Sequence, residues 1–544
     1  MIPEIMKHVI LSILTFVLCL GLNAQEKQVF QKVEQQCPTL PVGLLQAISQ
    51  TNTQCHHLTD EDYQVPADDP TAMPRAYGMM GLVSDGKGCF RENLKTVAVL
   101  SGYSEQEILD NPFINVLAYA RAFEKLAEQM DIRSSKAEDY IPVIEALSEL
   151  PMAEQKDELP MKMMLYSVFR EMGSDLQALF GDDYALLSGE MVSLAKETDY
   201  PNAIWIPAPP CNFEERTKEV SAVVIHYTEG SYAGCISWFQ NCDSQVSAHY
   251  VIRSSDGQVA QMVREADKAW HARTANGYTI GIEHEAYGDI ISFFTEAMYR
   301  SSADLVRNIC SRYDVIDGHR TFDRDTLDNG TTLNNGVHPQ GGEDACIKIR
   351  GHQHYPDQTH TDPGPFWDWN YYYKLINGGA EPIILGGAGV DEGNLDHLNY
   401  GNDERFIWVI LGEENSQITL EFTSFELETD FDFLWIYDGD NEFAPKIGRW
   451  NTMSPGLVTS SGNALCVEFR SDCLTTAEGW RAHWTVSHES VVEESLDWNQ
   501  EECETEVFDV LGRQVSENQM KSGVYIIRLT RKSDGQTRVK RIIR

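Results

Sequence analysis

The chain has 544 residues, more than one hydrophobic core of about 150 residues can organise, so we expect three or four domains. Hydrophobic residues make up 42% and charged residues 23%, which is typical of folded protein and excludes a disordered or collagen-like chain. The net charge of −40 excludes a protein that binds nucleic acid by neutralising phosphates. Residues 512–544, however, contain nine Lys or Arg and only two Asp or Glu. A basic tail on an acidic body indicates that the tail has a function of its own.

Residues 1–24 are typical of a secretory signal peptide. Lys7 and His8 precede an apolar run from Val9 to Leu22, and polar residues follow from Gln25. The run has 14 residues, fewer than the roughly 20 that span a bilayer, so a membrane anchor is the less favoured alternative. We expect a protein that passes through the periplasm and is secreted or held at the outer surface, without a membrane span.

Eleven cysteines remain once the signal peptide is removed. In an oxidising compartment we expect disulfides between cysteines that are close in sequence. The candidate pairs are Cys235 with Cys242, Cys310 with Cys346, Cys466 with Cys473, and Cys37 with Cys55. No CxxC pattern occurs, so a Cys-rich zinc cluster is not supported.

Residues 27–195 predict a helical domain. Leu44, Leu45 and Ile48 have helical spacing, the sequence Ser-Glu-Gln-Glu at 104–107 is a capping box, and residues 161–180 are amphipathic. A proline-rich linker at 201–211 follows.

From Val220 the pattern changes to short apolar runs mixed with helices, which predicts an α/β domain. The run from Val220 to Ile225 is a buried strand that places His226 at its carboxyl end, where such sheets usually bind ligands. His352 and Asp362 occur much later in the chain. A catalytic zinc takes three His or carboxylate ligands and leaves a fourth position to water, although a lone His is more often structural.

Seven motifs in this segment, taken in order, indicate a resemblance to a known family. They are VVIHYT at 223–228, SAHYVI at 247–252, DGQVAQMV at 256–263, AWHA at 269–272, TIGIEHE at 279–285, GHQ at 351–353 and TDPGPFWDW at 361–369. In this order they resemble the type 2 N-acetylmuramoyl-L-alanine amidases, relatives of the peptidoglycan recognition proteins, over residues 205–378. The resemblance implies a mixed sheet with flanking helices, and a zinc ion held by His226, His352 and Asp362.

The resemblance also implies that Glu283 activates the attacking water. Alternation along residues 280–283 places Glu283 on the face opposite Ile280 and Ile282, where a carboxylate is either a surface group or a general base. His360 stands where the bacterial enzymes commonly have Lys. It could donate to the oxyanion or orient Asp362.

Two further features of this domain leave alternatives open. His354 could compete with His352 as a ligand, but the ten-residue spacing from His352 to Asp362 is the one the family has. A polar insertion at 318–345 looks like an exposed loop.

The helical domain has a resemblance of its own. Residues 42–49 and 76–82 resemble the lysozyme-like lytic transglycosylases, with Asn52 where that family has its catalytic Glu. An amide cannot donate a proton as a carboxylic acid does. We therefore expect an inactive domain that binds glycan or acts as a scaffold, with an unrelated helical domain as the alternative.

Residues from about 400 to 487 alternate strictly and predict a β-sandwich, within a domain at 390–487. The segments at 418–440 and 465–472 resemble a CUB domain, and the resemblance implies calcium ligands at Glu428, Asp432 and Asp472. The alternative is that these acids are solvated turn residues.

Residues 500–544 predict a small β domain. The strings at 507–515, 523–530 and 539–544 resemble the C-terminal sorting domains of the type IX secretion system, which implies the secretion machinery as a partner. A purely structural β-hairpin is the alternative.

Together these patterns predict a multidomain chain of a helical lysozyme-like domain, an α/β amidase domain, a CUB-like β-sandwich and a β sorting domain. The predicted function is a secreted zinc-dependent peptidoglycan hydrolase that cleaves the amide between N-acetylmuramic acid and L-alanine. The alternatives are a non-catalytic peptidoglycan-binding protein and a surface adhesin that acts through its CUB-like domain.

Overall fold

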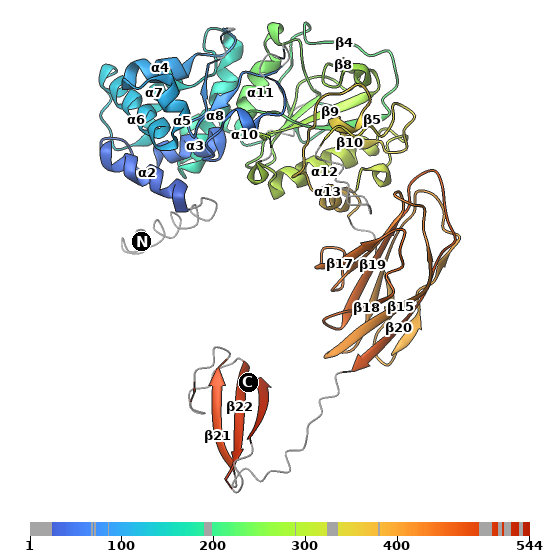
Figure 1. The fold of residues 1–544 in the computed structure, drawn as a ribbon. Helices are drawn as coiled ribbons and strands as arrows, with labels where there is room; N and C mark the ends of the chain where they lie inside the picture. Colours follow the sequence, from blue (N-terminus) through green and yellow to red (C-terminus); the bar gives the residue numbers. More distant parts are fainter. Residues whose placement is uncertain are drawn as a thin grey trace.

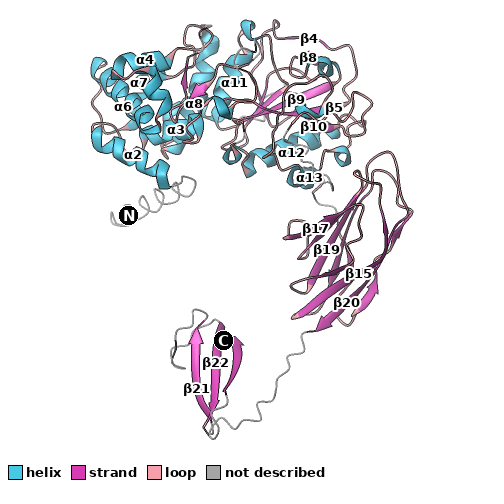
Figure 2. Ribbon diagram, viewed as in Figure 1, coloured by secondary structure: helices cyan, strands magenta, loops and turns pink. Residues whose placement is uncertain are grey.

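The structure is a computed structural model. It describes residues 24–66, 69, 72–84, 86, 88–189, 198–288, 290–323, 336–378, 381–488, 503–509, 514–515, 524–532 and 537–543. The predicted signal peptide up to residue 23 and part of the predicted loop at 318–345 lie outside the described residues. Among the helices of the described part, none is long and apolar enough to cross a membrane. Along the chain, Figures 1 and 2 show a helical part, an α/β part and then only strands.

The first part is helical, as predicted. Leu44, Leu45 and Ile48 are buried on one face of α3, and Ser104 and Glu107 form the reciprocal capping bonds that begin α5. The amphipathic stretch at 161–180 is two helices, because the backbone turns at Gly173 with a φ of 68°. The helices are α2 (Ala24–Gln36), α3 (Leu44–Thr53), α4 (Asn93–Ser101), α5 (Glu105–Asp110), α6 (Pro112–Gln129), α7 (Ile141–Leu147), α8 (Glu158–Glu171), α9 (Leu176–Phe180) and α10 (Tyr184–Leu187), with a short hairpin of β1 (Ala76–Tyr77) and β2 (Leu82–Val83).

The second part is built on a six-stranded sheet in the order β10-β5-β9-β6-β7-β3. Only β6 and β7 pair antiparallel, so the sheet is mixed, as predicted. Two helices, α12 and α13, pack on one face, and α11 packs on the other. The strands are β3 (Ala203–Trp205), β5 (Ala222–Tyr227), β6 (Tyr250–Ile252), β7 (Val259–Gln261), β9 (Thr279–His284) and β10 (Ile349–Gly351), beside the pair β4 (Phe213–Glu215) and β8 (Asp267–Ala269); the helices are α11 (Tyr232–Phe239), α12 (Glu296–Cys310) and α13 (Trp369–Ile376).

The helical part and the α/β part share one hydrophobic core, although a linker separates them in sequence. The same cluster of buried residues contains Phe30 of α2 and Trp238 of α11. Phe90 meets Trp238 edge to face at 6.3 Å, and Arg170 of α8 forms an ion pair with Asp256 at 2.7 Å. The two parts therefore pack against each other and are not independent domains.

The third part is a sandwich of two sheets, β11-β14-β19-β16-β17 and β12-β20-β15-β18. In β15, Ile418, Leu420 and Phe422 are buried and alternate with more exposed residues, as predicted. The strands are β11 (Ile383–Gly386), β12 (Glu392–Asn394), β13 (His397–Leu398), β14 (Arg405–Leu411), β15 (Ser416–Glu426), β16 (Phe433–Tyr437), β17 (Lys446–Trp450), β18 (Leu457–Thr459), β19 (Ala464–Arg470) and β20 (Gly479–His488).

The sandwich is joined to the α/β part by a buried charged cluster. Glu468 is fully buried, and it accepts bonds from Arg405 at 3.1 Å and from Arg470 at 3.0 Å. Arg470 lies 3.7 Å over the ring of Tyr373 in α13, and Lys374 lies 4.2 Å over the ring of Tyr437 in β16. The outer face of this sheet is therefore covered by α13.

Two disulfides are present among the described residues, and both differ from the predicted pairs. They are Cys211–Cys242 and Cys346–Cys473, with Cα–Cα distances of 5.5 and 5.8 Å. Cys37, Cys55, Cys235, Cys310 and Cys466 carry free thiols. The predicted pairs were wrong because Cys235 is buried inside α11 and Cys466 inside β19, so neither meets its near neighbour in sequence. The second disulfide links the α/β part to the sandwich.

The last part is a three-stranded antiparallel sheet in the order β21-β22-β23. Its strands are β21 (Cys503–Asp509), β22 (Val524–Arg531) and β23 (Thr537–Ile543). This agrees with the predicted small β domain at the basic end of the chain.

Candidate active site

Two adjacent parallel strands carry His226 and Glu283 to one end of the sheet. β5 is buried along its whole length, and it pairs with β9 so that His226 lies beside Glu283. Ile280 and Ile282 enter the core on one face of β9, and Glu283 lines a cavity on the other. The predicted alternation of this strand is confirmed.

The other two predicted zinc ligands come from the chain that follows β10. His352 directly follows the strand, and Asp362 lies in the loop before α13. A Cβ on Gly351 would lie 2.4 Å from Cδ of Pro363, so only glycine lets this loop approach the strand end.

These loops bring His226, His352 and Asp362 into one buried cluster. The potential ligand atoms all lie within 4.8 Å of one another. Nδ1 of His226 is 2.8 Å from one carboxylate oxygen of Asp362, and Nδ1 of His352 is 3.0 Å from the other.

The charge states of the cluster suit a metal. Burial lowers the pKa of His226 to about 4, so its ring is neutral near pH 7. Burial opposes ionisation of Asp362, but the charge of His352 and the imidazole hydrogen bonds hold its pKa well below the usual range. Two imidazole nitrogens and a carboxylate around one point are the donor set that catalytic zinc prefers.

A further set of side chains orients the two imidazoles. His226 Nε2 is 3.0 Å from Nδ1 of His271, whose Nε2 lies 3.3 Å from the hydroxyl of Thr279. His352 Nε2 is 2.6 Å from Oε1 of Gln358. If the Nδ1 atoms hold metal, each Nε2–H donates outward to one of these partners, which is the usual support for metal-binding histidines.

His271 and Gln358 were not predicted as site residues. His271 lies in the AWHA motif, which could have indicated a site residue. Its contact with His226, however, depends on the space that Gly281 leaves on the neighbouring strand. A Cβ on Gly281 would lie 2.6 Å from the ring of His271, and this glycine leaves room for the ring.

Glu283 lies beside His226 by strand register. Its Oε2 is buried and has no hydrogen-bond partner among the described residues. Burial, together with the charges of Asp362 and Glu229, raises the pKa of Glu283 well above its usual range. Positive charge at the cluster would oppose the two acidic charges and favour the ionised form of Glu283.

His360 and His354 have different environments. The ring of His360 stacks on His352 at 4.7 Å, Nδ1 lies 3.9 Å from Asp362, and burial lowers the pKa of the imidazole. His354 is fully buried, accepts a bond from the Gly351 amide at 3.1 Å and stacks on Phe322. His354 is therefore a structural residue and lies outside the cluster.

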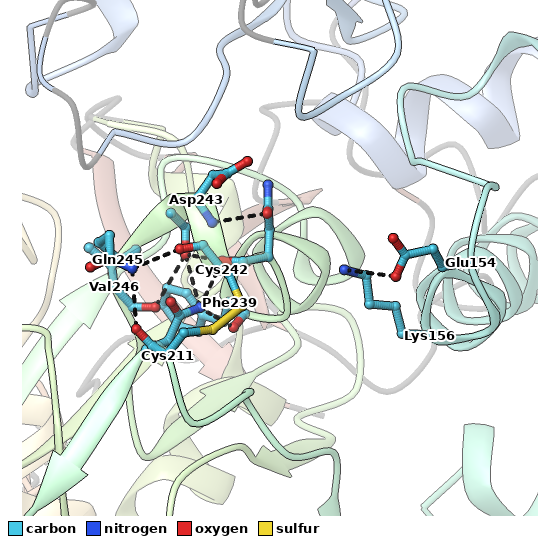
Figure 3. Close-up of a disulfide and its surroundings, with 11 residues drawn as sticks. Glu154, Lys156, Cys211, Phe239, Cys242, Asp243, Gln245 and Val246 are labelled. Carbon is cyan, nitrogen blue, oxygen red and sulfur yellow. Dashed lines mark hydrogen bonds and ion pairs between the residues drawn. A yellow bond between two sulfur atoms is a disulfide. The ribbon is translucent and has the colours of Figure 1, made fainter.

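A cavity of about 540 Å³ opens onto the cluster. One wall includes Gln245 and Val246, in the loop held by the Cys211–Cys242 disulfide (Figure 3). Gln245 donates to the carbonyls of Cys211 at 3.2 Å and Cys242 at 2.8 Å, which fixes this loop at the groove.

Two predicted sites lie elsewhere. Glu428, Asp432 and Asp472 come together in the sandwich as a second group of potential metal ligands. Burial, partly opposed by a hydrogen bond from Tyr400, raises the pKa of Asp432 to about 7. Asn52 lies on α3 and donates to the carbonyl of Met80 at 3.1 Å.

Comparisons with known proteins identify two parts of the chain. A family model described as N-acetylmuramoyl-L-alanine amidase matches residues 216–365, and a CUB domain model matches residues 391–484. N-acetylmuramoyl-L-alanine amidase A of Achromobacter lyticus is 41% identical over 190 residues, which are 34% of this chain and 97% of that protein. Neuropilin-1 of Gallus gallus is 37% identical over 106 residues, covering 18% of this chain and only 12% of that protein. Among solved structures, PlyL aligns at 15% identity with a TM-score of 0.23, covering 33% of this chain and 99% of that one. On the match to nearly the whole amidase A, this chain belongs to the N-acetylmuramoyl-L-alanine amidase family.

Proposed function

We propose that the chain is a zinc-dependent peptidoglycan hydrolase that cleaves the amide between N-acetylmuramic acid and L-alanine. The observation that carries the proposal is the buried cluster of His226, His352 and Asp362 beside Glu283, in a cavity of about 540 Å³. A chain that only bound peptidoglycan would have no need of an acidic group with a buried, unpartnered oxygen next to a ligand set.

His226, His352 and Asp362 would hold the zinc, and His271 and Gln358 would orient the two imidazoles. When bound, zinc supplies a Lewis acid that polarises the substrate carbonyl and acidifies water. Glu283 takes the proton from the attacking water at its free Oε2 and passes it to the leaving amine of L-alanine. His360 lines the same cavity and donates to the carbonyl oxygen as negative charge develops on it.

Metal dependence tests the proposal directly. The purified chain is stripped with a chelator and assayed on N-acetylmuramoyl-L-alanine, with the products identified by mass spectrometry. We expect cleavage to stop on chelation and to return with zinc, since deprotonated ligands and metal together create the nucleophile. Full cleavage by a metal-free sample would refute the mechanism.

For the CUB-like sandwich we propose calcium binding at Glu428, Asp432 and Asp472. The grouping of three carboxylates supports it, because hard oxygen ligands suit calcium. The site is tested by titrating calcium into the wild type and into Asp472→Asn and measuring the heat of binding by calorimetry. Equal heats from the wild type and the variant would refute the site.

For the helical domain we propose a lysozyme-like scaffold without glycosidase activity. Asn52 supports this, because its amide donates to the Met80 carbonyl and cannot serve as a catalytic acid. We expect a chain carrying Glu283→Gln to release no anhydro-muramic acid products from peptidoglycan, and detection of such products would overturn the assignment.

For the two ends of the chain we propose export by a signal peptide at residues 1–24 and a sorting domain recognised by type IX secretion machinery at 500–544. The antiparallel β21-β22-β23 sheet and the basic composition of the tail support the second assignment. A chain ending at residue 488 should accumulate in the periplasm, whereas normal secretion of that chain would refute it.

A further inference from the structure

One wall of the amidase groove is contributed by the helical domain. The cavity that opens onto the predicted zinc ligands is lined by Gln64, Val65, Asp69 and Met73, none of which lies in the α/β domain. Gln64 also accepts a hydrogen bond of 3.0 Å from Thr361, the residue that precedes the predicted ligand Asp362. We call Gln64, Val65, Asp69 and Met73 the N-terminal wall.

Glu229 fastens this wall to the sheet. Glu229 follows β5 by two residues, and its Oε1 accepts the backbone amides of Gln64 at 2.6 Å and Val65 at 3.1 Å. These bonds cross between the two domains at the edge of the groove. Loss of the carboxylate would leave two amides of the wall without their partner.

The α/β domain is also shaped to receive the wall. A Cβ on Gly230 would lie 1.6 Å from Cε of Met73, and a Cβ on Gly288 would lie 1.9 Å from the carbonyl oxygen of Asp62. Close below, Tyr63 meets Tyr287 edge to face at 6.1 Å. The contact therefore uses space that side chains on these two glycines would fill.

The two sides of the groove differ chemically. The α/β domain contributes Trp270, which is half-buried and whose indole donates to Glu214 at 3.3 Å. An aromatic face suits the C–H groups of a sugar ring. The N-terminal wall has no aromatic side chain among its lining residues; it offers apolar contact from Val65 and Met73 and polar groups from Gln64 and Asp69, which suit a peptide.

We propose that the N-terminal wall binds the stem peptide of the muropeptide and sets the preference for peptide length, with Glu229 as the positioning residue that holds it. The proposal rests on the amidase function above. It makes the helical domain a part of the active site, and it gives that domain a role that needs no glycosidase chemistry.

The test uses the full-length mature chain loaded with zinc and two defined substrates, N-acetylmuramoyl-L-alanine and the N-acetylmuramoyl tetrapeptide. We expect the wild type to favour the tetrapeptide. Gln64→Ala and Met73→Ala should each lower kcat/KM on the tetrapeptide about tenfold, through KM, the size expected for one hydrogen bond or one apolar contact. Both should leave the single-residue substrate within about twofold.

Three further variants separate the effect of the wall from general loosening of the interface between the domains. Arg170→Ala removes the ion pair with Asp256, which also joins the two domains, although neither residue lines the groove. We expect this change to leave kcat/KM unaltered on both substrates. Glu229→Ala should lower the preference for the tetrapeptide as the wall variants do, while Glu229→Gln, which keeps an acceptor oxygen, should retain most of it. Both changes remove a charge that raises the pKa of Glu283, so for these two variants only the ratio of kcat/KM on the two substrates is compared. If Glu229→Ala fails to fold, Gln64→Ala and Met73→Ala decide the question without it.

The outcomes distinguish this inference from the proposed function. Cleavage of neither substrate by the zinc-loaded wild type would refute the amidase assignment itself. If the wild type cleaves both substrates but the wall variants lose activity equally on both, or lose none, the proposed role of the N-terminal wall is wrong and the amidase assignment stands. A loss that follows the number of sugars, measured with the disaccharide tetrapeptide, would also overturn it, because it would place glycan on this side.

Discussion

At the scale of single residues, the site depends on side chains whose charge is set by their surroundings. Burial lowers the pKa of His226 to about 4. The charge of His352 and the hydrogen bonds from both imidazoles keep Asp362 ionised. Glu283 is the opposite case, because burial and two acidic neighbours raise its pKa. The cluster thus combines an ionised carboxylate with a neutral His226, beside an acidic group whose ionisation its surroundings disfavour.

Replacement of Glu283 by Gln should separate metal binding from proton transfer. We expect kcat to fall about 10²–10⁴-fold, since an amide cannot take a proton, with zinc content unchanged because the ligands remain. Metal analysis and steady-state kinetics on N-acetylmuramoyl-L-alanine measure both. The exposed Glu426→Gln serves as control, and activity near the wild-type level would exclude Glu283 as the base.

His360 stacks on His352 beside the cluster. Burial lowers the pKa of His360, so the ring loses its positive charge, and with it a charged donor, as pH rises towards 7. We expect His360→Ala to lower kcat on the order of a hundredfold, and His360→Lys to extend activity towards alkaline pH because ammonium stays charged. Zinc content and pH–rate curves of both variants decide; zinc loss in both would instead make His360 a support for Asp362.

At the scale of elements, strand β9 serves two purposes through alternate residues. Its isoleucines hold the sheet to α12 and α13, while Gly281 and Glu283 face the site. Gly281 leaves the space that the ring of His271 occupies, and His271 in turn meets His226. A glycine in a strand interior usually weakens the strand, and here the glycine permits a close approach.

Gly281→Ala should therefore act on the metal through His271. We expect zinc affinity to fall about 10–100-fold, the usual effect of losing an outer partner of a metal-binding histidine. Competition with a chelator measures the affinity of Gly281→Ala, His271→Ala and the double variant. Because both changes remove the same contact, the double variant should be no weaker than His271→Ala alone. Additive losses would show that the alanine acts on the strand and not on the ring.

At the scale of the whole molecule, three parts of the chain are held together by tertiary contacts in addition to the linkers between them. The helical part shares a core with the α/β part, and the sandwich is attached to α13 by the cluster of Arg405, Glu468 and Arg470 and by the Cys346–Cys473 disulfide. Burial disfavours ionisation of Glu468, but the two arginines outweigh it and lower the pKa of Glu468 to about 2.

This lowered pKa gives the molecule an acid-sensitive joint. Because Glu468 is a stronger acid in the folded state, its contribution to stability is present above the ordinary pKa of about 4.3 and is lost as pH falls towards 2. Glu468→Gln should lower stability at pH 7 by about 3–5 kcal/mol, since it leaves two buried arginines uncompensated, and should lose the acid-dependent part. Thermal unfolding between pH 2.5 and 7 tests this, and parallel curves for wild type and variant would contradict it.

The sequence by itself predicted the cluster of His226, His352 and Asp362 and the strand that carries Glu283, because the amidase motifs are local and the alternation of a strand fixes which face each residue takes. It also determined α3, the capping box at Ser104 and the alternation of β15, which depend on neighbours a few residues away. These features need no knowledge of distant segments.

Only the tertiary structure decided the partners that lie far apart in sequence. All five residues of the strand at 433–437 are apolar and buried, but only the packing shows that α13 is what covers the outer face of this sheet. The disulfide partners of Cys242 and Cys346 are 31 and 127 residues away, so proximity in sequence selected the wrong pairs. Gln64 and Met73 reach the groove because two domains share one core, and no local pattern encodes such a contact: it arises from the burial of apolar surface across the whole fold.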